Sequence, residues 1–289
     1  GTRSRWLLRN NGDGTFSDVT QASGLLRGRL NADPNYGRPG DIFVSGDVDN
    51  DGDVDIYVPA AAHKIDPEQE TSELMLNNGD GTFSLGPKDS AARFANKTAV
   101  PAGATFVDYD RDGLLDLWVT HNMVGGHNSP LPDVLLKGDG KGGFVDVSDK
   151  TGISTLPWST SPPLNAGKAH SWAWSSAACD LNNDGMPELL ASSYGRRPNH
   201  LWRATPAADG GVFYVNESVA SGYAYDHRQD WTDNLSAQCH CQDFPKDPDC
   251  DLPPAPPPGI CESLKNSFGG QYRWNHATGR EPFDLGGNS

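Results

Sequence analysis

One nine-residue pattern of oxygen-bearing side chains occurs three times in this chain and constrains its fold more than any other feature. Positions 1, 3, 5 and 9 carry Asp, Asn or Glu, and position 6 is Gly, at residues 47–55, 108–116 and 180–188. A loop of this kind directs several oxygens to one centre, and Ca²⁺ accepts six to eight oxygen ligands, including a backbone carbonyl from position 7. Without a cation the clustered carboxylates would repel one another. Solvated acidic turns are the plainer alternative, which three matching copies disfavour.

The residues around the loops indicate strands rather than the helices of an EF-hand. An EF-hand needs a bidentate Glu at position 12, where this chain has Val58, Val119 and Ala191. Short runs rich in β-branched and aromatic residues flank the loops, such as 42–44 and 56–58. Runs of this length bounded by Gly and Asp are typical of buried strands. Each ion is therefore expected in a loop between two β-strands.

A second signal accompanies the first and predicts β-hairpins. Apolar stretches separated by Asn, Asp and Gly follow each loop, at 73–84, 133–147 and 200–213, and a further copy at 6–19 opens the chain. Asn, Asp and Gly supply the positive φ angles that tight hairpins require. One repeat therefore holds four strands.

The spacing of the repeats predicts an all-β chain that forms a β-propeller of four-stranded antiparallel blades. The loops start at residues 47, 108 and 180, and a four-stranded unit that recurs along a chain packs its faces on its neighbours. A β-sandwich would show strands at this density but would not repeat the same loop. The expected domain, 1–216, contains a half-blade and three blades, followed by a Cys- and Pro-rich insertion and the start of a further blade. The half-blade is expected at 5–20 and the three blades at 40–87, 101–147 and 170–216. The insertion is expected at 217–270 and the start of the further blade at 271–289.

These paired signals resemble FG-GAP or VCBS repeats, the blade units of integrin α-subunit heads and of many secreted bacterial proteins. The phrase from Asn10 to Leu25 is similar to the group that includes cartilage acidic protein and ASPIC/UnbV-type proteins. The resemblance covers about residues 5 to 217. It implies about three Ca²⁺ ions, held by the loop acids and by the residue at position 7 of each loop. The implied metal-binding residues are Asp47, Asp49, Asp51, Asp53, Asp55, Asp108, Asp110, Asp112, Leu114, Asp116, Asp180, Asn182, Asp184, Met186 and Glu188.

The third loop departs from the family pattern, with Asn182 and Glu188 in place of Asp. It carries one negative charge fewer, so we expect it to bind Ca²⁺ most weakly. The family does not settle an activity, because such propellers serve as adhesion heads, lectins and scaffolds for sugar-cleaving enzymes.

The charge of the chain excludes several classes of partner. Its formal net charge is −15, and nucleic-acid binding needs clustered Lys and Arg that it lacks. No run of 18 apolar residues exists that would predict a membrane span. Each bound Ca²⁺ would offset two of the negative charges.

Four of the five cysteines predict a stapled insertion. Cys239, Cys241, Cys250 and Cys261 lie in a segment rich in Pro, Asp and Gln without the apolar periodicity of a core. Two disulfides would hold such a loop, and the pairing is not readable from sequence. A zinc site that uses these thiolates and His240 is the rival, although zinc sites prefer two or more residues between paired cysteines. Cys179 is expected to be a buried free thiol.

The number of repeats predicts that the chain is part of a longer, about seven-bladed ring. Closed propellers usually have four to eight blades, and this chain offers half a blade and three complete ones. The rest of the propeller or another chain would supply the missing strands. Alternatively, the N-terminal half-blade pairs with a C-terminal strand and closes a four-bladed ring.

Candidate ligand-binding residues are few. His121 and His127 share a loop with Gly125 and Gly126 that could fold over a ligand, although exposed loop histidines without a role are commoner. Aromatic side chains in exposed loops stack on sugars or anchor proteins. The preferred contact residues in the insertion are Tyr223, Tyr225 and Trp231.

Taken together, the sequence predicts a secreted or cell-surface calcium-binding propeller that acts as a binding or adhesion module for a protein or carbohydrate. Enzymatic action is the alternative: a polysaccharide lyase, dehydratase or hydrolase with His121, His127, Tyr194 or Arg196 near its active site. A structural subunit of an extracellular assembly is the third possibility.

Overall fold

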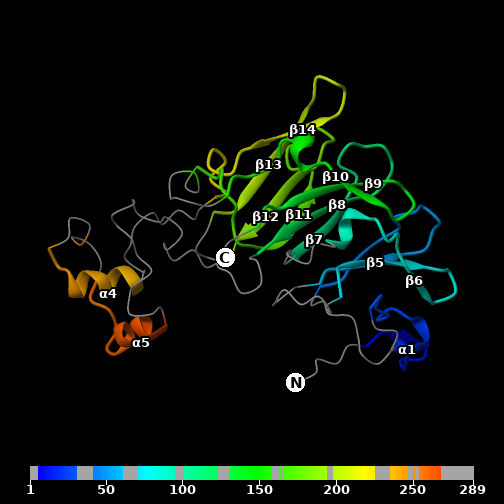
Figure 1. Ribbon diagram of the computed structural model, residues 1–289, viewed down its shortest axis with the longest axis horizontal. Helices are drawn as coiled ribbons and strands as arrows, with labels where there is room; N and C mark the ends of the chain where they lie inside the picture. Colours follow the sequence, from blue (N-terminus) through cyan, green and yellow to red (C-terminus); the bar gives the residue numbers. More distant parts are fainter. Residues whose placement is uncertain are drawn as a thin grey trace.

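Three four-stranded antiparallel sheets and one two-stranded sheet form the framework of the computed structural model (Figure 1). The structure describes residues 6–30, 42–60, 70–94, 101–122, 131–157, 163, 166–193, 198–224, 235–246, 250 and 254–267. Strand order within each full sheet follows the order in sequence, so every pair is antiparallel and joined by a local connection. The predicted all-β fold of four-stranded propeller blades is confirmed.

The first full sheet contains β3 (Val44–Gly46), β4 (Asp55–Val58), β5 (Glu73–Asn77) and β6 (Phe83–Leu85). The second contains β7 (Pro101–Val107), β8 (Asp116–His121), β9 (Val134–Gly138) and β10 (Phe144–Asp146). The third contains β11 (Ala173–Cys179), β12 (Glu188–Ser193), β13 (His200–Pro206) and β14 (Val212–Asn216). The acidic loops join the first and second strands of each sheet, as the sequence predicts.

Consecutive sheets pack face to face through large apolar side chains. Between the second and third sheets, Trp118 and Tyr214 are buried together with Leu189 and Trp202. The indole N–H of Trp118 donates a 3.0 Å hydrogen bond to the carbonyl oxygen of Leu190 on the next sheet. Burial of each such side chain contributes about 1.5–3 kcal/mol, so packing between the sheets adds substantially to stability. Figure 1 shows these two sheets side by side.

The two-stranded sheet, β1 (Leu8–Asn10) and β2 (Phe16–Asp18), has the register of the last two strands of a full blade. Asn10 pairs with Phe16 as Asn77 pairs with Phe83 in the first full sheet. The side chain of Phe16 is 61 % exposed, whereas that of Phe83 is 8 % exposed. Leu8 is 53 % exposed, and Met75 at the equivalent position is 0 % exposed. The described part of the chain therefore leaves this sheet without the cover that its counterpart has.

Several short helices were not predicted from the sequence. α1 (Thr20–Ser23) and α2 (Ser148–Thr151) follow the outer hairpins, and each ends at a Gly with positive φ. A 3₁₀ turn, η1, spans Ala91–Arg93. The Cys-rich segment was expected to be a loop, but it contains α4 (Leu235–Asp243) and α5 (Ile260–Ser267). The polar composition of this segment gives no apolar periodicity that would predict helices. The two helices are joined by one of the disulfides described below.

Candidate metal centre

The three acidic loops share one backbone conformation. The Gly at position 6 has a φ of 95° in Gly52, 85° in Gly113 and 84° in Gly185. Position 4 is also left-handed in each loop, with a φ of 57° at Asn50, 62° at Arg111 and 60° at Asn183. The sequence pattern predicts a turning residue only at the Gly of position 6, so the left-handed residue at position 4 is a feature that the structure adds. Asn tolerates this region well, whereas a long side chain such as Arg adopts it at a cost of about 1–2 kcal/mol.

The first carboxylate of each loop closes the turn. Asp47 accepts hydrogen bonds from the backbone N–H groups of Asp51 at 3.1 Å and Gly52 at 3.0 Å. Asp108 and Asp180 accept the equivalent bonds in their loops. These bonds to a charged acceptor are stronger than neutral ones, so they hold the first carboxylate at a fixed place.

The carboxylate at position 9 is buried in all three loops, and in the first two it connects its loop to the neighbouring strand of the sheet. Asp55 accepts hydrogen bonds from Val48 N at 2.9 Å and from Asn77 N, on β5, at 2.8 Å. Asp116 repeats this arrangement with Tyr109 N at 3.0 Å and Gly138 N, on β9, at 2.9 Å. This residue is therefore part of the sheet as well as of the loop.

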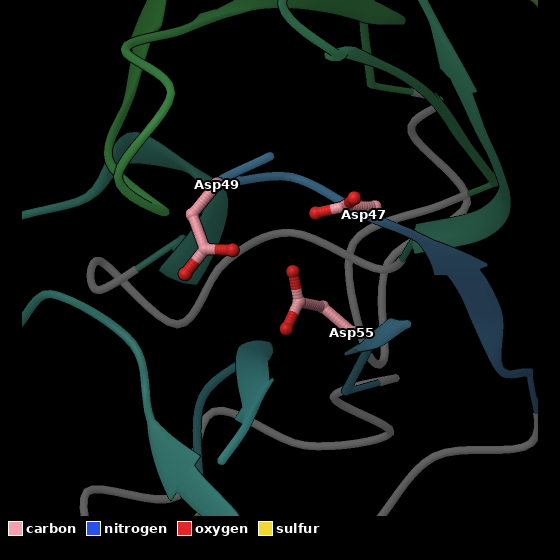
Figure 2. A group of neighbouring side chains, drawn as sticks. All are labelled: Asp47, Asp49 and Asp55. Atoms are coloured by element: carbon pink, nitrogen blue, oxygen red, sulfur yellow. The ribbon is translucent and has the colours of Figure 1, made fainter. Parts of the chain in front are cut away.

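Two of the loops bring three carboxylates to one centre. One oxygen each from Asp47, Asp49 and Asp55 lies within 4.8 Å of the others, and Asp108, Asp110 and Asp116 form the same group. Figure 2 shows the first group with its carboxylates turned toward a common space. A cation with metal–oxygen distances of 2.3–2.6 Å could contact three oxygens at this spacing.

The electrostatics of these groups favour a bound cation. One oxygen each of Asp49 and Asp110 is buried and has no hydrogen-bond partner among the described residues. Burial, and then the charges of Asp51 and Asp47, raise the pKa of Asp49. Burial raises the pKa of Asp116 to about 7 despite two backbone hydrogen bonds. The raised pKa values measure how unfavourable the ionised groups are without a positive charge, and the oxygens without partners fit metal ligands.

Position 5 does not join these groups. Asp51 accepts a hydrogen bond from the N–H of Asp53 at 2.9 Å, and Asp112 accepts one from Leu114 at 2.9 Å. The carboxylate at position 5 therefore orders the peptide at position 7. That Asp51, Asp112, Asp184 and the carbonyls of Asp53, Leu114 and Met186 contact the ion stays a prediction.

The third loop has the same turn but a different charge arrangement. The side-chain amide of Asn182 donates to Asp184 at 3.0 Å and to Glu188 at 3.4 Å. This amide supplies hydrogen-bond donors to two carboxylates of the loop, which reduces their need for a bound cation. The expected weak Ca²⁺ affinity of this loop is consistent with these bonds.

Loops of neighbouring sheets lie next to each other. The side-chain amide of Asn50 donates a 3.3 Å hydrogen bond to the carbonyl oxygen of Gly113 in the second loop. The guanidinium of Arg111, at the equivalent position of the second loop, lies against Gly185 in the third. Position 4 of one loop therefore contacts position 6 of the next, so the three loops form one continuous edge.

The structure changes the interpretation of several other candidate residues. His121 lies at the end of β8, is buried and packs edge-on against Phe94 at a centroid distance of 5.0 Å, so it is not an exposed loop histidine. Cys179 is free but exposed, whereas a buried thiol was expected; it ends β11, where its side chain points away from the core. Tyr223 is half-buried, and its hydroxyl lies 3.0 Å from that of Ser192. Tyr225, Trp231, His127, Tyr194 and Arg196 lie outside the described residues.

The four clustered cysteines form two disulfides. Cys239 pairs with Cys261, and Cys241 pairs with Cys250. The first bond joins α4 to α5. Because all four sulfurs are bonded, no thiolate of this group is left for the zinc site that the sequence also allowed.

Comparison with known families identifies the repeat. Residues 47–119 match the family described as FG-GAP-like repeat, and no curated protein matches the chain. The matched segment begins at the first acidic loop and ends in β8, after the second loop. None of the described helices is long and apolar enough to cross a membrane. The expected kinship with the ASPIC/UnbV group stays a prediction; residues 47–119 are an FG-GAP-like repeat, in a chain whose four-stranded sheets are consistent with propeller blades.

Proposed function

We propose that this protein is a calcium-dependent binding or adhesion module that works outside the cell. The observation that carries the proposal is the pair of carboxylate groups, Asp47, Asp49 and Asp55 and Asp108, Asp110 and Asp116, whose oxygens converge within 4.8 Å. The FG-GAP-like repeat covers both groups.

The donor set favours Ca²⁺ over other cations. All candidate side-chain ligands are oxygens, which suit hard cations such as Ca²⁺ and Mg²⁺ and not the softer Zn²⁺ or Cu²⁺. The loop offers many ligands in a loose arrangement, whereas Mg²⁺ requires a near-octahedral shell and usually keeps several waters. When bound, Ca²⁺ would neutralise the carboxylates; the loop residues themselves would position it through the backbone bonds to Asp47 and Asp55.

Calcium at these sites would stabilise the contacts between blades. The position-9 carboxylates of Asp55 and Asp116 bond to the neighbouring strand, and Asn50 bonds to the next loop. A cation that fixes these carboxylates orders each loop on its own sheet, and the bond from Asn50 to Gly113 links the ordered first loop to the second. A ligand-binding surface spread over several blades would depend on this order.

The disulfides support an extracellular location. Two disulfides in one small segment are typical of proteins in oxidising compartments. Extracellular modules also use weak calcium sites, with Kd values of about 10⁻⁴ to 10⁻³ M. The surface partner we propose is a protein or a carbohydrate, with Tyr223 as the one preferred contact residue among those described.

The half-covered two-stranded sheet supports the view that the blades belong to a larger ring. Leu8 and Phe16 occupy positions that are buried in the first full blade. A complete ring would cover them with two further strands. We propose about seven blades in total.

A thermal-unfolding experiment tests the calcium proposal. Thermal unfolding is measured in about 1–10 mM Ca²⁺, in the same concentration of Mg²⁺ and in excess chelator. Ca²⁺ at about ten times Kd stabilises the folded protein by roughly 1.4 kcal/mol per site. We expect a melting temperature higher by a few degrees in Ca²⁺ than in chelator and a smaller effect of Mg²⁺. Identical melting curves in Ca²⁺ and chelator would exclude calcium-dependent stabilisation.

A glycan array, run with and without Ca²⁺, then tests the binding role. Retention of a glycan only in Ca²⁺ is expected of a lectin, and release of cleaved products would instead show an enzyme. Binding to no glycan, together with capture of a surface protein, would favour protein adhesion.

A further inference from the structure

A lysine from a neighbouring strand reaches into the second acidic loop. The ammonium of Lys137, on β9, contacts the carboxylate of Asp110 and lies 2.6 Å from Asp112 Oδ2. The same ammonium is 5.7 Å from the centroid of the Tyr109 ring. Asp110 is one of the three carboxylates that converge at the candidate metal centre. The ammonium of Lys137 therefore places a positive charge of the protein itself next to the candidate metal centre.

The strand register shows that this position is equivalent in every blade. In each blade, the residue after the position-9 acid pairs with one residue of the third strand: Met75, Leu136 or Trp202. The residues that follow these three therefore occupy equivalent positions, and they are Leu76, Lys137 and Arg203. Leu76 brings no charge to the first loop. Arg203 lies 3.1 Å from Glu217 instead, on the outer hairpin of its own sheet. Among these three described positions, Lys137 alone is paired with loop carboxylates.

The ion pair leaves the second loop in a different state from the first. Asp110 Oδ2 and Asp112 Oδ2 have the ammonium as a partner, while the other oxygen of Asp110 remains buried without one. The first loop has the same convergent carboxylates with the uncharged Leu76 at the corresponding strand position. A divalent cation that enters the second loop must displace the ammonium or bind beside it. At a separation of about 6 Å and a dielectric constant near that of water, this repulsion corresponds to roughly a tenfold lower affinity.

We propose that Lys137 is a tethered counter-ion of the second loop, which lowers the Ca²⁺ affinity of this loop below that of the first and keeps it ordered without metal. This inference rests on the proposed calcium function. It makes the loops unequal: the first binds Ca²⁺ at lower concentrations, and the second responds only when Ca²⁺ is abundant.

Calcium titration of a reciprocal pair of variants tests the proposal. Lys137→Leu gives the second loop the residue of the first, and Leu76→Lys gives the first loop the residue of the second. By isothermal titration calorimetry at fixed pH and ionic strength, we expect Lys137→Leu to tighten one site about tenfold and Leu76→Lys to weaken another by a similar factor. Arg203→Leu, which removes a cation at the equivalent position that is paired elsewhere, is the matched control and should leave all affinities unchanged.

Two further variants keep the test interpretable. Lys137→Gln retains a polar, uncharged side chain and should tighten the same site if Lys137→Leu does not fold. In an Asp110→Asn background, which removes a ligand of the second loop, Lys137→Leu should no longer change the remaining affinities. Thermal melts in chelator should show the opposite trend, with Lys137→Leu less stable than the parent because its carboxylates have lost their counter-ion.

The outcomes separate the two proposals. If the parent protein binds no Ca²⁺ in the calorimeter, the calcium function itself is wrong. If the parent binds Ca²⁺ and both Lys137→Leu and Lys137→Gln bind it with the parent's affinities, Lys137 is a surface ion pair and the counter-ion role is overturned.

Discussion

Asp133 Oδ2 lies 4.0 Å from Nδ1 of His200, and both side chains are buried where the second sheet meets the third. The other oxygen of Asp133 accepts a 2.7 Å hydrogen bond from the N–H of His121. Burial raises the pKa of Asp133 to about 8, and burial, followed by the nearby His170, lowers the pKa of His200 to about 4. Near pH 6 both groups are therefore neutral, and the interface holds an acid and an imidazole without an ion pair.

This arrangement predicts a loss of stability as the pH rises from about 6.5 to about 8. Between its unfolded pKa near 4 and its folded pKa of about 8, Asp133 binds a proton in the folded state that the unfolded state lacks. The free energy of unfolding therefore falls as pH rises, by about 2 kcal/mol between pH 6.5 and 8. Asp133→Asn, which keeps an acceptor for His121, should flatten this dependence in urea melts. An unchanged slope in the variant would show that Asp133 is ionised in the folded protein.

The acidic loops predict opposite effects for two neighbouring aspartates. Asp49 has a buried oxygen without a partner and a raised pKa, so Asp49→Ala should leave the metal-free protein as stable or up to about 1 kcal/mol more stable. The same change should lower Ca²⁺ affinity by about tenfold or more, because it removes a charged ligand.

Asp55→Ala is the matched comparison in the same loop. Asp55 accepts bonds from Val48 N and Asn77 N, and its loss leaves one buried and one partly buried donor without an acceptor. We expect about 3 kcal/mol of destabilisation even in chelator. Denaturant melts with and without Ca²⁺ measure both effects. Equal destabilisation by the two variants in chelator would contradict the assignment of Asp49 as a metal ligand whose burial destabilises the metal-free protein.

The unequal cover of the hairpins predicts unequal effects of two phenylalanines. Phe83 packs with Val58 and Met75, so Phe83→Ala should cost about 3–5 kcal/mol. Phe16 holds the same hairpin position but is exposed, so Phe16→Ala in this 289-residue chain should change stability by less than about 0.5 kcal/mol. Chemical denaturation of both variants checks the pair. A large loss from Phe16→Ala would mean that another part of the chain covers the two-stranded sheet.

The disulfides predict a stability that is local to the helical segment. Cys239–Cys261 closes a separation of 22 residues and Cys241–Cys250 one of 9 residues, which corresponds to about 3 kcal/mol each. The double variant Cys239→Ser with Cys261→Ser should make α4 and α5 susceptible to limited proteolysis, while the blade melting temperature stays unchanged. Cys179→Ser, a free thiol elsewhere, serves as the control and should alter neither property. Loss of blade stability in the double variant would show that the helices support the sheets.

Much of the candidate site is visible in sequence because its geometry is local. The turn from Asp47 to Asp55 needs only the order of its residues and one Gly, so three copies of the pattern were enough to place three loops between strands. The hairpins follow from the same local rule, since Asn, Asp and Gly at fixed offsets favour tight turns.

Local rules fail where distant strands decide the surroundings of a side chain. His121 stands shortly before Gly125 and Gly126 in the sequence, which is typical of an exposed residue, yet it ends β8 and is buried, with Phe94 packed against it. The pairing of four closely spaced cysteines also depends on how α4 and α5 lie together, and no sequence spacing fixes that.

The sequence by itself determined the repeated acidic turns and their oxygen-rich chemistry, because each depends on residues close together in the chain, and the four-stranded unit followed from the repetition of two such local signals. Only the tertiary structure decided that Asp55 and Asp116 are buried and bonded to the next strand, that Lys137 reaches the second loop and that Asn50 contacts Gly113. These relationships join residues 22 to 63 positions apart, so they follow from strand register and sheet packing rather than from local preference.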